Sequence, residues 1–448
     1  MIRDEGLYLI YVMASLLFVF AIKGLSHPKT AKTGSDLAIF GMMLAVIGTL
    51  FVLPSEHDFW IIGVCLIAAV TGIFWGKAVQ MKALPQMIAL LNGVGGLSSL
   101  LVGFAQIWNQ NRNATDISLG MVIGAVAFSG SLIAFLKLQG LYRLKRLPFF
   151  NFINAVIFCF LCLIWIRFIN NQTMSEAYFL CAMAMLFGLT ITLPVGGADM
   201  PIVISVLNAF SGFAASAIGF SLINVALIIT GALVGASGTI LALFMGRAMN
   251  RSLISVFFKK EHQTNIGQNM QNRRAKQGSA EDAAFLMQNA SKIIIVPGYG
   301  MAAAGAQYAL KNMAEILEKK YHADVRFAIH PVAGRMPGHM NVLLAEAKVD
   351  YEKVASLEEI NDDFETADVA YVIGANDITN PRAKTDVSSP LYGMPILDVS
   401  KAKTVFVVKR SLNTGYAGIE NPLFFENNTL MLYGDAKKIT EEIIADFS

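Results

Sequence analysis

The chain has 448 residues, of which 55% are hydrophobic and only 15% are charged, and its mean hydropathy is +0.54. Because an ordinary soluble domain carries about 25% charged residues, these values exclude a single soluble globule. The formal net charge of +3 is too small to indicate binding to nucleic acid. Of the 67 Asp, Glu, Lys and Arg residues, 22 occur up to Phe258 and 45 after it. The composition therefore predicts a lipid-embedded first part and a water-exposed second part.

Nine apolar segments in the first part are long enough to cross a bilayer, which takes about 17 to 25 residues. The N-terminus lacks a basic region and a cleavage site, so we expect the first segment to be a retained helix. All four cysteines lie inside apolar segments, which favours packing over a disulfide or a metal site. The nine segments cover residues 6–22, 36–53, 59–76, 84–108, 117–136, 149–169, 176–194, 200–220 and 222–245.

The loops between these segments indicate an orientation. Counted on alternate sides of the membrane, thirteen Lys and Arg residues fall on one side and three, Arg3, Arg112 and Arg167, on the other. Cytoplasmic loops are enriched in Lys and Arg, so this asymmetry predicts an N-terminus outside and a cytoplasmic C-terminal part. We expect a transmembrane domain over 1–250, a polar linker over 251–290 and a cytoplasmic domain over 291–448.

The second part alternates short apolar runs with helical stretches. Strand-like runs occur at 292–296, 325–329, 369–373, 404–408 and 430–433, and helical stretches at 301–320, 342–347 and 436–445. Short runs that are buried on both faces and alternate with helices are typical of a parallel, doubly wound sheet. The predicted fold is therefore an α-helical membrane bundle followed by an α/β Rossmann-like domain.

A glycine motif follows the first predicted strand. Gly298, Gly300 and Ala303 match G-x-G-x-x-A in the strand, turn and helix context that dinucleotide sites require. Gly298 would permit the tight turn, Gly300 would let the backbone approach a diphosphate, and Ala303 would keep helix and strand close. The alternative is a glycine-rich tight turn without a ligand.

The nucleotide preference depends on two strand ends. The second strand is followed by His330 and Pro331, where an NAD site is expected to offer a carboxylate to the ribose. The strand at 404–408 is followed by Lys409, Arg410 and Ser411, two cations and a hydroxyl that suit a 2′-phosphate. This favours NADP over NAD, although an ordinary charged strand end is an equally good interpretation of these three residues alone.

Three further polar or glycine-rich loops leave strand ends, at 331–338, 374–381 and 413–422. The last combines glycines with an aromatic residue and is a candidate lid over a nucleotide. The sequence offers neither a nucleophile with a base nor a cluster of metal ligands, so a cofactor would carry any redox chemistry.

A few polar residues fall within or next to the apolar segments. Asn92, Ser129, Ser131 and Asn208 lie inside spans, and Asp199 lies between the seventh and eighth. Such residues line a proton or ion path or simply bond neighbouring helices, and for a lone Asn or Ser the second interpretation is favoured. Rows of glycines at 93–96, 124–130 and 231–238 indicate close helix packing.

These motifs together resemble the β subunit of the proton-translocating nicotinamide nucleotide transhydrogenase over essentially the whole chain. The family's NADP(H)-binding domain is matched in order, and two segments of the membrane region also match. The matching segments are 297–302, 332–341, 374–377, 409–412, 415–422 and 434–437, with 197–201 and 248–252 in the membrane part.

The resemblance implies an enzyme of the bacterial inner membrane that moves hydride between NAD(H) and NADP(H), coupled to proton passage. NADP(H) would bind this chain, NAD(H) would bind a separate α subunit with its own membrane helices, and the α/β assemblies would form a dimer. Asp377 and the lid would switch the nucleotide between open and occluded states, while Asn208, Ser129 and Ser131 match the proposed proton route. The nucleotide contacts that the resemblance implies are Tyr299, Val332, Ala333, Gly334, Arg335, Met336, Pro337, Gly374, Ala375, Asn376, Asp377, Ile378, Gly393, Met394, Lys409, Arg410, Ser411, Leu412, Asn413, Thr414, Gly415, Tyr416, Asp435 and Ala436.

One position departs from some members of the family, which carry a histidine where this chain has Asn92. A neutral Asn cannot take up a proton near pH 7, and no histidine occurs inside any predicted span. We therefore hypothesise that the titrating group comes from membrane helices of the partner subunit. Two rival functions remain open: a transporter whose cytoplasmic domain senses a dinucleotide, and a scaffold that only anchors such a domain.

Overall fold

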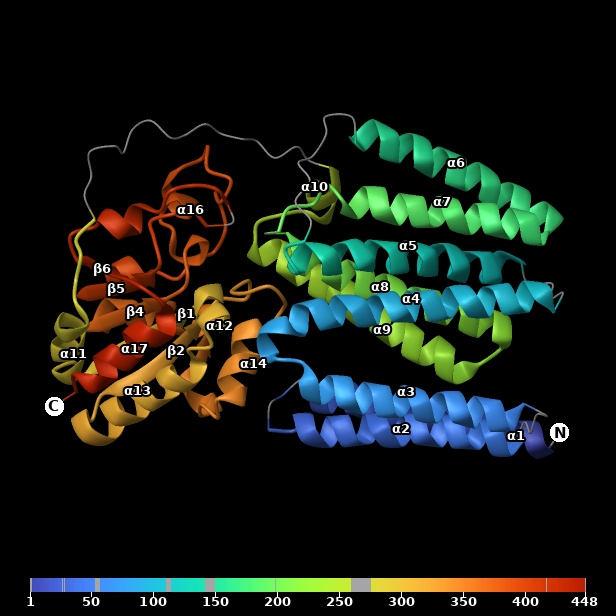
Figure 1. Ribbon diagram of the computed structural model, residues 1–448, viewed down its shortest axis with the longest axis horizontal. Coiled ribbons are helices and arrows are strands. Elements are labelled where there is room, and N and C mark those ends of the chain that lie inside the picture. The colour runs from blue at the N-terminus through green and yellow to red at the C-terminus, as the bar shows by residue number, and fades with distance from the viewer. Residues whose placement is uncertain are drawn as a thin grey trace. The chain divides into compact units, whose positions relative to one another are not determined.

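A computed structural model describes residues 2–25, 27, 29–52, 57–109, 114–141, 150–197, 199–258, 275–415 and 417–447 (Figure 1). These residues form two compact units, which are described separately. The first unit comprises Met1–Gly196 with Val203–Ala242, and the second comprises Gly197–Ile202 with Leu243–Ser448. The middle of the expected linker, residues 259–274, lies outside the described residues.

Nine long apolar helices account for almost all of the chain up to residue 248, and within the described residues each is long and apolar enough to cross a membrane. This confirms the predicted helical bundle. Local sequence explains several helix starts: Pro85 occupies the first turn of α4, and the Thr173 hydroxyl accepts the Glu176 amide at the start of α7. The helices are α1 (Ile2–Leu25), α2 (Ala31–Val52), α3 (Asp58–Ala78), α4 (Leu84–Trp108), α5 (Ala114–Leu138), α6 (Phe150–Asn171), α7 (Met174–Thr192), α8 (Met200–Leu222) and α9 (Val225–Ala248).

Glycines bring several of these helices into close contact. A Cβ atom on Gly96 of α4 would lie 2.6 Å from the carbonyl oxygen of Gly124 on α5, and one on Gly212 of α8 would lie 2.4 Å from the amide nitrogen of Gly235 on α9. No larger side chain fits at these distances, so the backbones approach directly. The prediction of close packing at the glycine rows is confirmed.

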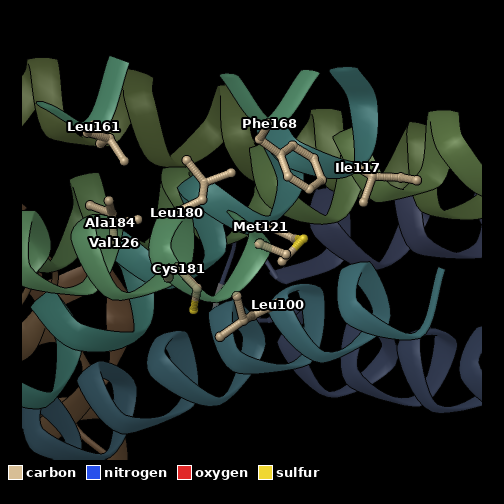
Figure 2. Close-up of a cluster of buried hydrophobic side chains, with 11 residues drawn as sticks. Leu100, Ile117, Met121, Val126, Leu161, Phe168, Leu180, Cys181 and Ala184 are labelled. Atoms are coloured by element: carbon tan, nitrogen blue, oxygen red, sulfur yellow. The ribbon is translucent and has the colours of Figure 1, made fainter. Parts of the chain in front are cut away.

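An apolar core joins α4, α5, α6 and α7 (Figure 2). Leu100, Met121, Leu161 and Leu180 are among its buried members, and Cys181 packs with them as one more apolar side chain. In contrast, α3 has no buried residue along its whole length. The two N-terminal helices α1 and α2 pack on each other, with a 2.9 Å hydrogen bond between the Tyr11 and Thr49 hydroxyls.

The second unit contains a six-stranded, fully parallel sheet in the order β3-β2-β1-β4-β5-β6, which confirms the predicted Rossmann-like fold. The central strands are buried because helices flank the sheet, as expected for parallel strands. The strands are β1 (Lys292–Pro297), β2 (Asp324–Ile329), β3 (Val354–Ser356), β4 (Val369–Ile373), β5 (Thr404–Lys409) and β6 (Thr429–Tyr433); the helices are α10 (Leu253–Phe258), α11 (Ala280–Gln288), α12 (Tyr299–Ala304), α13 (Gln307–Tyr321), α14 (His339–Glu346), α15 (Leu357–Ile360), α16 (Arg382–Thr385) and α17 (Ala436–Ala445).

Three local features differ from the expectations. The helix expected over 301–320 is two helices, α12 and α13, because Gly305 adopts a left-handed conformation with φ +67° and ends the first. The short edge strand β3 was not expected, since only three residues pair with β2. The last part of the expected linker forms α11, whose Ser279 and Asp282 make a reciprocal capping box.

Candidate functional site

The strand order places a change of winding direction between β1 and β4. The chain continues from β1 outward to β2 and β3, and from β4 outward to β5 and β6 on the other side. In such sheets ligands bind at the carboxyl ends of the strands where the order reverses. The loops that follow β1 and β4, which carry Gly298, Gly300 and the segment from Gly374 to Ile378, lie at this point.

These two loops are joined backbone to backbone. The amide of Gly298 donates to the Ile373 carbonyl at 2.9 Å, and the amide of Gly300 donates to the Gly374 carbonyl at 2.9 Å. A Cβ on Gly300 would lie 2.5 Å from the Cα of Gly374, which itself has φ +68°. Glycine is therefore required here for the contact between two loops, a reason that the sequence interpretation did not include.

The expected role of Ala303 is wrong. Ala303 is exposed on α12, whereas Met301 and Ala302 are buried. α12 is a short helix that ends at Ala304. Its buried residues lie in its first turn, and Ala303, three residues after Gly300, points to solvent. Ala302 is the small residue that packs at this position.

Two buried histidines hold the loop after β2. The Nδ1 atom of His330 accepts the Val332 amide at 3.2 Å, and its Nε2–H donates to the Pro395 carbonyl at 2.7 Å. The Nδ1 atom of His339 accepts the Arg335 amide at 3.1 Å. Burial lowers the pKa of each ring to about 4, with the Arg335 charge adding to the effect at His339. Both rings are therefore neutral acceptors near pH 7.

The side chains of the same loop contact the glycine turn. The Arg335 guanidinium lies over the Tyr299 ring at 4.2 Å from its centroid, and Ala333 and Met336 are buried. A cation over an aromatic face is an attractive contact, so the first turn of α12 and the loop after β2 are joined side chain to side chain.

The strand end at Lys409 also carries the predicted polar groups. The Lys409 ammonium donates to the Asn413 carbonyl at 2.6 Å and lies 4.7 Å from the Phe424 ring centroid. Burial lowers the pKa of Lys409 to about 8, opposed by the nearby Asp377 carboxylate. Arg410 is exposed and makes a 3.0 Å ion pair with Asp435, which caps α17.

The candidate lid contacts the loop after β4 along its length. The Ala417 amide donates to the Asp377 carboxylate at 2.9 Å, and a Cβ on Gly415 would lie within 2.8 Å of three atoms of that carboxyl group. At the other end, the buried Asn421 amide donates to the Asn376 carbonyl at 3.0 Å and its oxygen accepts the Leu423 amide at 3.1 Å. Tyr416, predicted to contact the nucleotide, lies outside the described residues.

The remaining predicted residues follow the same edge of the sheet. Met394 and Ile419 share a small apolar cluster, which brings the lid against the segment before β5, and Gly393 has φ +79°. The Ser411 hydroxyl accepts the Asn413 amide at 3.4 Å. Ala375, Ile378 and Ala436 are buried, Leu412 is exposed, and Gly334, Pro337 and Thr414 lie in the loops described above.

In the first unit, which contains most of the membrane helices, three of the predicted polar residues lie on helices that contact one another: Asn92 on α4, Ser131 on α5 and Asn208 on α8. The buried Asn92 on α4 donates to the Ile204 carbonyl on α8 at 3.3 Å, one helical turn before Asn208. A Cβ on Gly93 would lie 3.2 Å from the Cβ of Ser131 on α5, so Ser131 faces the same level of α4. Asn92, Ser131 and the Asn208 turn thus come from three different helices.

Ser129 and Asp199 lie elsewhere. The Ser129 hydroxyl donates to the Ala125 carbonyl at 3.0 Å and packs where a Cβ on Gly188 of α7 would go, so it faces α7. Ser129 and Ser131 are two residues apart on a helix and point to different sides for that reason. Asp199 immediately precedes α8 and is half-buried.

Four functional candidates were missed at the sequence level: His330, His339, Asn380 and Asn421. All four are at most 1% exposed and bond loop backbone rather than each other. Their only sequence signal is a position within or next to the glycine-rich loops, which does not distinguish a backbone anchor from an exposed polar residue.

A bundle of lipid-length helices joined to a doubly wound parallel sheet, with glycine turns and cations at the sheet's carboxyl edge, defines a membrane protein that carries a Rossmann-like domain. The chain belongs to the NAD(P) transhydrogenase beta subunit family, whose model matches residues 7–446. It is 49% identical over 452 residues to the NAD(P) transhydrogenase subunit beta of Rhodospirillum rubrum, with 97% of each chain covered. The same subunit from a named strain of that species matches equally.

Proposed function

We propose that the C-terminal domain binds NADP(H) and that the chain exchanges hydride with NAD(H) held on an α subunit, coupled to proton movement across the membrane. The observation that carries the proposal is that Gly298 and Asp377 lie on the two loops at the switch point of the sheet, with Lys409 of the neighbouring strand β5 near the Asp377 carboxylate, in a chain of this family. An oxidoreductase of the NAD(P) transhydrogenase family needs one nucleotide on each side of the transfer.

The residues at the sheet edge fit NADP(H). Gly298 and Gly300, which carry no side chains, would let a diphosphate approach the turn at the start of α12, and Lys409 and Arg410 would hold a 2′-phosphate. The nicotinamide ring supplies the hydride chemistry when bound. The lid, tied to Asp377 and Asn376, would exclude water from the nucleotide, and its release would let the nucleotide leave.

In the membrane unit, Asn92, Ser131 and Asn208 would contribute polar groups to a proton route. Asn and Ser side chains donate and accept hydrogen bonds but do not ionise near pH 7. The group that takes up the proton is therefore proposed to come from helices of the α subunit. A structure of the complex with no partner His, Asp or Glu near Asn92 or Asn208 would refute this part.

The proposal includes the assembly and its orientation. The excess of Lys and Arg on alternate loops supports a cytoplasmic C-terminal domain and an external N-terminus in the bacterial inner membrane. The α subunit would bring NAD(H) to the cytoplasmic side, and two α/β assemblies would form a dimer.

The test uses membrane vesicles that contain this chain with or without the α subunit. We expect NADPH to reduce an NAD analogue only when the α subunit is present, and an imposed pH gradient to change the rate. Rates unaffected by the gradient would refute coupling. Nucleotide binding without any turnover would instead favour a dinucleotide-sensing transporter. The absence of both binding and turnover would favour the scaffold hypothesis.

A further inference from the structure

His339 is completely buried at the start of α14, directly beside the loop of residues 332–337. Its ring occupies the space that a side chain at Gly334 would need: a Cβ built there would lie 2.6 Å from Nδ1 and 2.7 Å from the His339 Cβ. Gly334 has φ +113°, a conformation that other residues rarely adopt. The loop therefore folds directly over the imidazole.

The ring bonds the loop at one defined atom. Nδ1 of His339 accepts the Arg335 amide at 3.1 Å, and the Arg335 guanidinium lies 4.2 Å from the centroid of the Tyr299 ring. The His339 and Tyr299 ring centroids are 6.5 Å apart. His339 thus fixes the backbone of the residue whose side chain reaches the glycine turn after β1.

We propose that His339 is a positioning residue for NADP(H): its Nδ1 atom holds the Arg335 amide and thereby sets the loop of residues 332–337 against Tyr299 in the geometry that recognises the nucleotide. The inference rests on the proposed function of this domain. His339 acts through Arg335, and no role in hydride transfer is assigned to it.

The protonation state supports this role. Burial and the Arg335 charge lower the pKa of His339 to about 4, so the ring is neutral near pH 7 and Nδ1 keeps its lone pair. The proton then resides on Nε2, a buried atom for which the described residues supply no hydrogen-bond partner. The described protein uses only the Nδ1 side of the ring, which makes the two nitrogens separable by mutation.

Three substitutions in the full chain test the proposal. In His339→Asn the amide oxygen takes the place of Nδ1, in His339→Gln the amide reaches the place of Nε2 instead, and His339→Leu removes both. The dissociation constant for NADPH is measured in detergent for each variant, alongside its thermal unfolding. With the α subunit added, KM for NADPH and kcat are measured separately.

We expect His339→Leu and His339→Gln to bind NADPH about tenfold more weakly, because a tenfold change corresponds to about 1.4 kcal/mol and a buried amide without an acceptor costs about that much. His339→Asn should stay within about twofold of the unmodified chain. The loss should appear as a higher KM with kcat nearly unchanged, since only positioning of the loop is altered.

Two results would overturn the inference. One is NADPH binding by a folded His339→Leu chain within about twofold of the unmodified chain. The other is rescue by Gln and not by Asn, which would assign the effect to Nε2. Failure of the unmodified chain itself to bind NADPH would refute the proposed function of the domain, so the two failures are distinguishable.

Discussion

At the scale of single residues, two buried histidines of the candidate site bond backbone rather than other side chains. His330 and His339 accept two amides of the same loop, Val332 and Arg335, and both are held neutral by burial. A neutral imidazole can accept a hydrogen bond from an amide, whereas an imidazolium cannot. The loop geometry is therefore compatible only with unprotonated rings.

This gives a pH dependence of stability with a defined sign. Each folded-state pKa, about 4, lies below the ordinary value of 6.5, so the unfolded chain takes up protons first as the pH falls. The contribution of each neutral histidine to the free energy of unfolding is complete above about pH 6.5. It is lost as the pH falls from there to about pH 4, by up to roughly 3 kcal/mol per ring. This loss of stability can be measured by urea denaturation of the detergent-solubilised chain at several pH values, with the protease sensitivity of the C-terminal domain as the readout of unfolding.

The control is the chain with both histidines replaced by Asn. This double variant should be less stable at neutral pH but should lose most of the slope between about pH 6.5 and about pH 4. An unchanged slope in the double variant would assign the acid sensitivity to other groups.

At the scale of elements, single polar side chains join the ends of neighbouring elements by hydrogen bonds to backbone groups. Asn421 ties the end of the lid to the loop after β4, and Lys137 at the end of α5 donates to the Thr192, Leu193 and Val195 carbonyls at the end of α7. A lysine over the last carbonyls of a helix satisfies acceptors that have no partner within the helix and also interacts favourably with its dipole.

Replacing Asn421 by Ala should loosen the lid. The Leu423 amide would lose its partner, at a cost of about 1–3 kcal/mol for a buried group, and the Asn376 carbonyl would keep only its hydrogen bonds from Thr379. We expect faster release of NADPH in a stopped-flow dilution experiment. Asn289→Ala, at an exposed position at the end of α11, is the matched control and should leave the release rate unchanged.

Replacing Lys137 by Met should destabilise the membrane unit. Met keeps the length and apolar stem of the side chain but donates no hydrogen bond to the end of α7. The thermal midpoint in detergent should fall by several degrees, whereas Lys77→Met at the exposed end of α3 should change it little. Equal effects of the two substitutions would mean that the contacts at the end of α7 contribute nothing specific.

The elements differed in how well the sequence predicted them. The nine spans and the five longer strands follow from apolar runs whose length matches a bilayer or a buried strand. The edge strand β3 has no such apolar run, because it is half-buried and only three residues long. The break between α12 and α13 at Gly305 is also not marked by any change in the apolar pattern. In the site, the glycine turns were recognisable, but His339 and Asn421 were not, because a single buried polar residue has no spacing to detect.

At the scale of the whole molecule, two units in two solvents would have to act together for hydride exchange to move protons. The first unit offers Asn92, Ser131 and Asn208 on three helices that contact one another, and the second unit offers the loops at the carboxyl ends of the parallel strands. If the two activities are coupled, a substitution that blocks proton movement should also slow hydride exchange, whereas loss of one activity alone would indicate simple coexistence in one chain.

Asn92→Leu should impair proton movement without removing nucleotide binding. The substitution removes the hydrogen bond to the Ile204 carbonyl and a polar group from the proposed proton route. We expect NADPH binding to be retained and proton movement, followed with a pH-sensitive dye in vesicles with the α subunit, to fall at least about tenfold.

The matched control for Asn92→Leu is Asn154→Leu. Asn154 is also a buried Asn, and it bonds the Thr190 carbonyl between α6 and α7. It should retain proton movement. A similar loss in both variants would mean that the effect is one of helix packing.

The neutral histidines have a further consequence for a protein proposed to work across a pH difference. Because burial lowers the pKa of both rings to about 4, they stay neutral near pH 7 and keep their hydrogen bonds to the loop of residues 332–337. Acidification beside the membrane would not act on NADP(H) affinity through them. An effect of protons on NADP(H) affinity would instead have to act through a group such as Lys409, whose pKa burial lowers to about 8, or through movement of the lid.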